Sequence, residues 1–193
     1  MKIYMNNPSS KAITTINEIN NIVNKLNELF NTSCEYNIRA EENQKLRSET
    51  LPIYEEQEII YANIIVRLEH EKDQLNTKLK QLNPLHLNER KRLQHELTEK
   101  ENQIGLHYNN YSRAKNCVSE IIKKISANEE FIDAHPLIPT HLAHQHIIVR
   151  ELNPAIKKLS KIIKTPLVLY NPTSMFYIER FELSSEERFE LEQ

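Results

Sequence analysis

The sequence has 193 residues, a formal net charge of −2 and two distant cysteines, Cys34 and Cys117. A chain of this length can bury a hydrophobic core, and its near-neutral charge gives no general reason to bind nucleic acid. The cysteines form neither a disulfide framework nor a CxxC metal pair, which fits a reducing compartment. No apolar run approaches the roughly 20 residues that a membrane helix needs, so we expect a soluble protein without a transmembrane segment.

The single glycine, Gly105, lies inside a helical pattern. Phosphate-binding loops, dinucleotide-binding turns and nucleophile elbows all need glycines, because their backbones adopt positive φ or approach a ligand closely. The sequence therefore contains none of these motifs. We expect no cofactor, and the composition favours a non-enzymatic protein without excluding every enzyme.

The first predicted helix follows Ser9 or Ser10, either of which can cap its N-terminus. Its apolar residues recur at spacings of three and four, which predicts a helix packed on a core; they are Ile16, Ile19, Val23, Leu26 and Phe30. Residues 31–50 are polar and leave two alternatives, a loop or an upstream extension of the next helix that is kinked at Pro52.

Two stretches with apolar residues seven apart come next, over about 53–83 and 88–127. The first includes Tyr54, Tyr61, Leu68, Leu75 and Leu82, and the second includes Leu97, Ile104, Tyr111, Val118 and Ile125. Sustained heptads predict a left-handed helical seam, and the short "NPLHLN" loop predicts that the two helices are antiparallel.

The register of this hairpin can be predicted, because facing residues in a fold about His86 have numbers that sum to about 172. The rule pairs Leu75 with Leu97 and makes nearly every other pair apolar. Lys72 opposite Lys100 is the exception, and we expect both lysines to turn outward towards Glu69, Glu71 or Glu101.

The apolar residues of the hairpin are unevenly distributed. "IIYANIIV" (59–66) is apolar on nearly all sides and predicts burial among several helices, whereas residues from about 67 to 103 predict a solvated arm. We therefore expect a predominantly all-α protein with a helical-bundle base and a protruding antiparallel coiled-coil hairpin. Residues 1–183 would form one domain and residues 184–193 a flexible acidic tail.

The last third contains five of the eight prolines. Short helices are expected at about 129–134, 140–152 and 155–164, broken at Pro136, Pro139, Pro154 and Pro166. "PLVLYNPTSMFYIERFEL" is the only β-like stretch. It predicts either a small hairpin or an extended segment laid over the base.

Several residues are candidates for a site. His135, His141 and His144 are candidate metal ligands, although they lack the spacing of an HExxH motif. Lys157, Lys158 and Lys161 lie on a basic amphipathic segment, 155–164, whose apolar face is expected to be core. An anionic lipid surface or an acidic partner is the alternative for that segment. Leu85, His86 and Leu87 at the hairpin turn either close the seam or form a contact point.

The C-terminal "SSEERFELEQ" carries four glutamates, Glu186, Glu187, Glu190 and Glu192, with Leu191 third from the end. It resembles the translocation signal of effectors of the Dot/Icm type IVB secretion system, which has a glutamate-rich block, small polar residues and a hydrophobic residue near that position. The resemblance covers about a tenth of the chain. It implies a protein that is made in the bacterial cytoplasm and secreted into the cytosol of a host cell.

Three classes of function fit these patterns. The first is a non-enzymatic effector or adaptor that binds a host protein through its helical surface or its coiled-coil arm. The second is a metal-dependent enzyme centred on the histidine-rich residues 133–151. The third is a bacterial structural coiled coil that associates with itself. The patterns favour the first.

Overall fold

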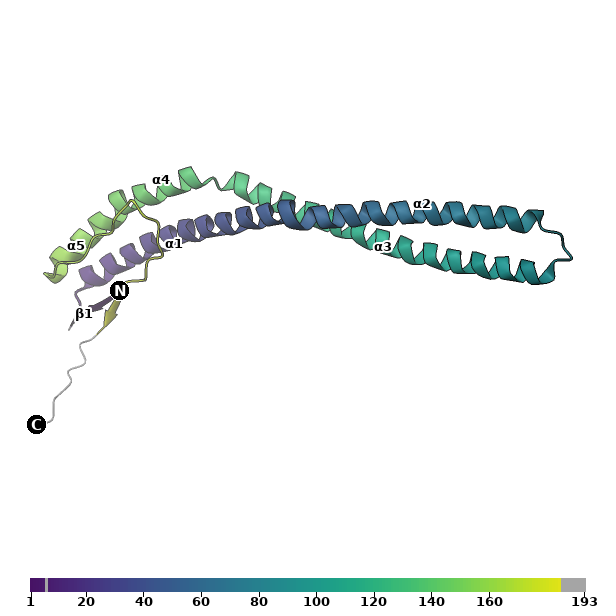
Figure 1. The fold of residues 1–193 in the computed structure, drawn as a ribbon. Helices are drawn as coiled ribbons and strands as arrows, with labels where there is room; N and C mark the ends of the chain where they lie inside the picture. Colours follow the sequence, from purple (N-terminus) through teal and green to yellow (C-terminus); the bar gives the residue numbers. More distant parts are fainter. Residues whose placement is uncertain (6, 185–193) are drawn as a thin grey trace, which may run out of the picture. The chain divides into compact units, whose positions relative to one another are not determined.

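The computed structural model describes residues 1–5 and 7–184, and it is predominantly α-helical, as predicted (Figure 1). None of the helices in these ranges is both long enough and apolar enough to cross a membrane. The elements are β1 (Lys2–Tyr4), α1 (Ser10–Lys45), the π-helical turn η1 (Leu46–Thr50), α2 (Leu51–Gln81), α3 (Leu87–Ala134), α4 (Leu137–Ile147), a second π-helical turn η2 (Ile148–Leu152), α5 (Asn153–Ile163) and β2 (Glu182–Ser184).

The contacts of the chain divide it into two compact units. Unit 1 comprises Met1–Arg39 and Phe131–Gln193, and unit 2 comprises Ala40–Glu130. The first boundary falls inside α1 and the second inside α3. Each unit has its own packing and is described by itself.

The core of unit 1 forms between α1, η2 and α5. The predicted apolar stripe of α1 is buried at Ile16, Ile19, Val23 and Leu26, which are at most 4% exposed, and partly buried at Phe30. Ile148, Leu152, Ile156 and Leu159 face it and are fully buried. Ser9 is the N-cap, because its hydroxyl oxygen accepts a hydrogen bond from the Ala12 N–H at 3.2 Å.

An extended segment, residues 165–184, crosses unit 1 after α5, and we call it the strap. It is not the predicted hairpin but the alternative, an extended segment laid over the helices. It buries Ile178 and Phe181 in the core of unit 1. Its last three residues form β2, which pairs in parallel with β1 (Figure 1). Ser184, which the sequence assigns to the tail, therefore lies opposite Tyr4 in a strand.

Three asparagines hold the strap by its backbone. The side-chain amide of each one donates to a strap carbonyl, and its oxygen accepts from the N–H of the same strap residue. Asn27 bonds Ile178, Asn20 bonds Phe181 and Asn153 bonds Tyr170, at 2.8–2.9 Å. An extended chain has no internal hydrogen bonds, so these side chains take the place of a neighbouring strand.

The helical backbone continues through Pro52, where a kink was one of the two predicted alternatives, and through Pro154, where a break was predicted. Pro52 and Pro154 each follow a π-helical turn, in which the Leu51 N–H bonds Leu46 and the Asn153 N–H bonds Ile148, five residues back. A proline has no N–H to donate, and its ring clashes with the carbonyl four residues earlier in an α-helix. The wider π turn relieves this conflict. The predicted break at Pro154 is therefore wrong, and so is the one at Pro139, which lies in the first turn of α4.

Unit 2 contains the antiparallel pair of α2 and α3, which lie side by side up to the turn (Figure 1). Contacts across the pair support the predicted register. The Lys100 Nζ lies 2.6 Å from a Glu71 oxygen, and the Lys72 Nζ lies 3.5 Å from a Glu101 oxygen. Both lysines therefore turn outward, as predicted, and the residue numbers in each pair sum to nearly 172. The hydrogen bond from Lys100 lowers the pKa of the Glu71 carboxyl.

The predicted burial of residues 59–66 is wrong. Ile59 is 62% exposed, Ile60 46% and Val66 67%, whereas Ile65 is buried. The described part of unit 2 buries only the seam side of α2, because α3 is the only helix packed along this stretch. A stretch of helix that is apolar on every side is buried only where other helices pack against it.

A buried polar pair joins α1 to α3 within unit 2. The Asn128 amide donates to the Asn43 side-chain oxygen at 3.0 Å, and the Asn43 amide donates to the Ile125 carbonyl at 3.3 Å. Both asparagines are at least nine-tenths buried. A buried asparagine pair of this kind fixes the register of two helices, because any slip leaves amide groups without partners.

Candidate functional site

A groove of about 810 Å³ lies in unit 1 between the start of α1 and helix α5. It contains the three predicted lysines, Lys157, Lys158 and Lys161, and brings Lys11 of α1 beside them. Its other lining residues are Ser10, Thr14, Thr15, Pro154 and Ile162. We call it the basic groove.

The fold of α5 aims these lysines outward. Ile156 and Leu159 are fully buried, so the apolar face of the helix is core, as predicted. That face is consequently not available to a lipid surface. The Lys158 Nζ lies 2.9 Å from a Glu18 oxygen. In the described part of the chain, the ammonium groups of Lys11, Lys157 and Lys161 make no ion pair or hydrogen bond.

The three candidate histidines have separate environments. The His135 ring stacks on Phe131 at 4.3 Å between centroids, and its Nδ1 lies 2.9 Å from the Phe131 carbonyl. The His141 Nε2 lies 3.4 Å from the Ser33 hydroxyl. Among the described residues, no group of three or more histidines, cysteines and carboxylates is placed to hold a metal ion.

His144 is the unusual member of this group. It is fully buried, and neither ring nitrogen has a hydrogen-bond partner. The ring of Phe176, in the strap, lies edge-on to it at 6.3 Å between centroids. Burial lowers the pKa of its imidazole, and the neighbouring His141 lowers it further. His144 is thus a buried imidazole that is uncharged at neutral pH.

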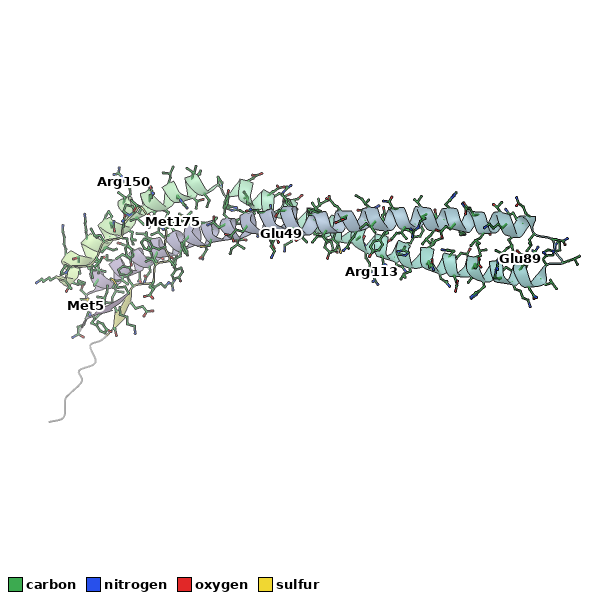
Figure 2. The ribbon with its side chains drawn as sticks, in the orientation of Figure 1. Met5, Glu49, Glu89, Arg113, Arg150 and Met175 are labelled. Atoms are coloured by element: carbon green, nitrogen blue, oxygen red, sulfur yellow. The ribbon has the colours of Figure 1, made fainter. Side chains whose placement is uncertain are left out.

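The hairpin turn exposes its leucines. Leu85 is 84% exposed and Leu87 66%, so neither closes the seam. The Asn83 side-chain oxygen accepts from the Leu85 N–H at 3.0 Å, and the Asn83 carbonyl accepts from the His86 N–H at 3.0 Å. These bonds fix the turn. Figure 2 shows Glu89 just beyond it, near the end of the hairpin.

A larger set of exposed apolar side chains lies on α2, and three of its four members belong to the stretch 59–66 that was predicted to be buried. Ile53, Ile59, Ile60 and Val66 are 46–67% exposed. At about 100° per residue, the four side chains occupy a sector roughly 140° wide, opposite the buried Ile65 and Leu68. We call this sector the α2 stripe.

The residues of the C-terminal signal, Glu186, Glu187, Glu190, Leu191 and Glu192, lie outside the described residues. Similarity to known proteins gives no further guidance. The chain matches no protein-family model, and no curated protein or solved structure is significantly similar to it.

Proposed function

We propose that the protein is a non-enzymatic effector that binds a host protein through the helical surface of unit 2. The observation that supports this proposal best is the α2 stripe. Its four β-branched apolar side chains lie within fourteen residues of one helix and are half or more exposed on average. Several large apolar side chains exposed on one side of a helix are a feature of protein interfaces.

Helix formation does not explain these residues. Isoleucine and valine lose side-chain freedom in a helix and form helices less readily than alanine, leucine, lysine or glutamate. At exposed positions they gain no burial in compensation, and they lower solubility. A partner that covers the stripe accounts for them, because fully burying an exposed side chain of this size contributes roughly 1.5–3 kcal/mol, and about half of each of these side chains remains to be buried.

The geometry favours an amphipathic helix as the part of the partner that binds. The stripe runs along fourteen residues of α2, and the exposed Glu56, Asn63 and Arg67 lie among its apolar side chains. A second helix can pack along such a surface with its apolar residues at spacings of three and four. The exposed Leu85 and Leu87 at the turn offer a second contact on the same unit.

Binding is tested by affinity capture from host-cell lysate, with bacterial lysate as the control. Replacing Ile59 and Val66 with serine should abolish capture of the host partner, whereas replacing Leu85 and Leu87 with serine tests the turn separately. Both variants should retain the helicity of the parent. If the parent instead forms dimers that the stripe variant does not form, self-association through the stripe replaces this proposal.

Export is a separate part of the proposal and rests on the resemblance of the C-terminal residues to Dot/Icm signals. A reporter fused to the full chain should enter host cells, and a chain ending at Ser184 should not deliver it. Replacing the four glutamates with alanine, or Leu191 with serine, should weaken delivery. Ending the chain at Ser184 keeps β2 intact, so the melting temperature should stay within a few degrees of the parent. Continued delivery by the shortened chain would refute the role of the tail.

A further inference from the structure

We propose that the basic groove binds the chain's own acidic C-terminal segment, residues 185–193. The groove offers four lysines over an apolar floor. Three of the ammonium groups, those of Lys11, Lys157 and Lys161, have no ionic partner among the described residues. Pro154, Ile162 and the aliphatic parts of the lysines supply apolar surface in the same groove. The ligand that fits is an acidic peptide with apolar side chains.

Residues 185–193, "SEERFELEQ", have this chemistry. Four glutamates outnumber one arginine, and Phe189 and Leu191 alternate with two of the glutamates. Carboxylates at the rim and apolar side chains on the floor would match the two kinds of surface in the groove. Charge complementarity therefore selects this segment as the occupant.

The position of Ser184 places the groove within reach of the residues that follow it in sequence. The Ser184 carbonyl accepts a hydrogen bond from the Met5 N–H at 3.0 Å. Because β1 and β2 are parallel, their C-terminal ends, Tyr4 and Ser184, lie at the same end of the sheet. Ser10, which lines the groove, is five residues after Met5. The groove at Ser10 is therefore at most about 18 Å from Met5. Nine extended residues span up to about 30 Å, which is enough to reach and enter the groove.

The test uses two forms of the purified protein, the full chain and a chain that ends at Ser184. A fluorescent peptide of residues 185–193 is titrated into each, with anisotropy as the readout. The shortened chain should bind the peptide, and the full chain should bind it about tenfold more weakly because its own segment competes at a high effective concentration. A peptide with glutamine at the four glutamate positions should not bind.

A matched pair of charge reversals locates the site. In the shortened chain, K157E with K161E should weaken peptide binding by about tenfold or more. K91E with K123E changes the net charge equally at exposed positions of unit 2 and should leave binding unchanged. Circular dichroism of both variants shows whether each is folded.

Three outcomes would overturn the proposal: no binding by the shortened chain, equal affinity of the two chain lengths, or equal loss in both reversal variants. Binding of the shortened chain to vesicles of phosphatidylcholine with phosphatidylserine is measured in a parallel experiment. Binding to these vesicles through Lys157 and Lys161 without binding of the peptide would assign the groove to anionic lipid instead. The measurement is independent of export, so its failure leaves the proposed role of the tail in delivery standing.

Discussion

The Asn27 side chain forms hydrogen bonds with both the N–H and the carbonyl of Ile178. Its amide donates to the Ile178 carbonyl at 2.8 Å, and its oxygen accepts from the Ile178 N–H at 2.9 Å. The two residues are 151 positions apart, and the contact buries the Ile178 side chain against α1. Asn20 and Asn153 repeat the arrangement, so the strap is part of the fold of unit 1.

Replacing Asn27 with alanine should destabilise the protein by about 2–3 kcal/mol, because the N–H and C=O of Ile178 would lose their partners at a buried site. Replacing Asn21, an exposed asparagine on the same helix, should change stability by less than about 0.5 kcal/mol. Thermal unfolding compares the two variants. Equal stabilities would show that the asparagines do not hold the strap.

Two substitutions in α2 distinguish buried from exposed positions in the apolar stretch 59–66. Replacing Ile65, which is 5% exposed, with aspartate should cost several kcal/mol, since an unpaired carboxylate would enter the seam. Replacing Ile59 with aspartate should cost less than about 1 kcal/mol. Denaturant unfolding followed by circular dichroism measures both. A large loss for Ile59 as well would show that a further helix covers it.

The hairpin was predictable because its information is local. Heptad spacing fixes the seam, and Lys72 and Lys100 could be assigned outward positions because acidic residues lie within reach on the facing helix. The same reasoning failed for Ile59, Ile60 and Val66. Apolar side chains on every side of a helix indicate surfaces that are unfavourable to expose to water. The pattern does not show whether another part of the same chain buries them.

The contacts of the strap were not predictable for a different reason. Asn20, Asn27 and Asn153 have the same signature as the many solvated asparagines of this chain, and their partners are distant in sequence. The parallel pairing of β1 with β2 joins residues about 180 positions apart, and a three-residue strand has no periodicity to detect. Lys11 was missed as part of the basic groove because only the fold brings α1 beside α5.

Stability should fall in mild acid because of His144. Its folded-state pKa lies below the ordinary value of about 6.5, so the unfolded state binds the proton more readily. The contribution of the neutral ring is complete above pH 6.5 and is lost as the pH falls below it, by up to about 1.4 kcal/mol per pH unit.

His144→Leu should remove most of this pH dependence, and His141→Ala should retain most of it, since His141 is exposed and adds the smaller part of the shift. Urea unfolding between pH 5 and pH 8 measures the slopes. A parent protein with equal stability over this range would contradict the assignment of His144 as an uncharged core residue.

Gly105 offers a stabilising substitution. It lies in the middle of α3, is exposed, and an added Cβ would meet nothing within 4 Å. Gly105→Ala should therefore raise stability by about 0.5–1 kcal/mol through reduced backbone entropy of the unfolded chain. An increase in melting temperature checks this. A decrease would mean that the position is not an ordinary helical one.

The most direct test of the central proposal places a photo-reactive residue at position 59 or 66 of the α2 stripe, and at Ser119, an exposed polar position of α3, as the control. After irradiation in host-cell cytosol, positions 59 and 66 should give one adduct of the same mass, and position 119 should not give it. That adduct should be heavier than the chain by the mass of a host protein. The same adducts from all three positions, or none from 59 and 66, would contradict the proposal that the stripe binds a host protein.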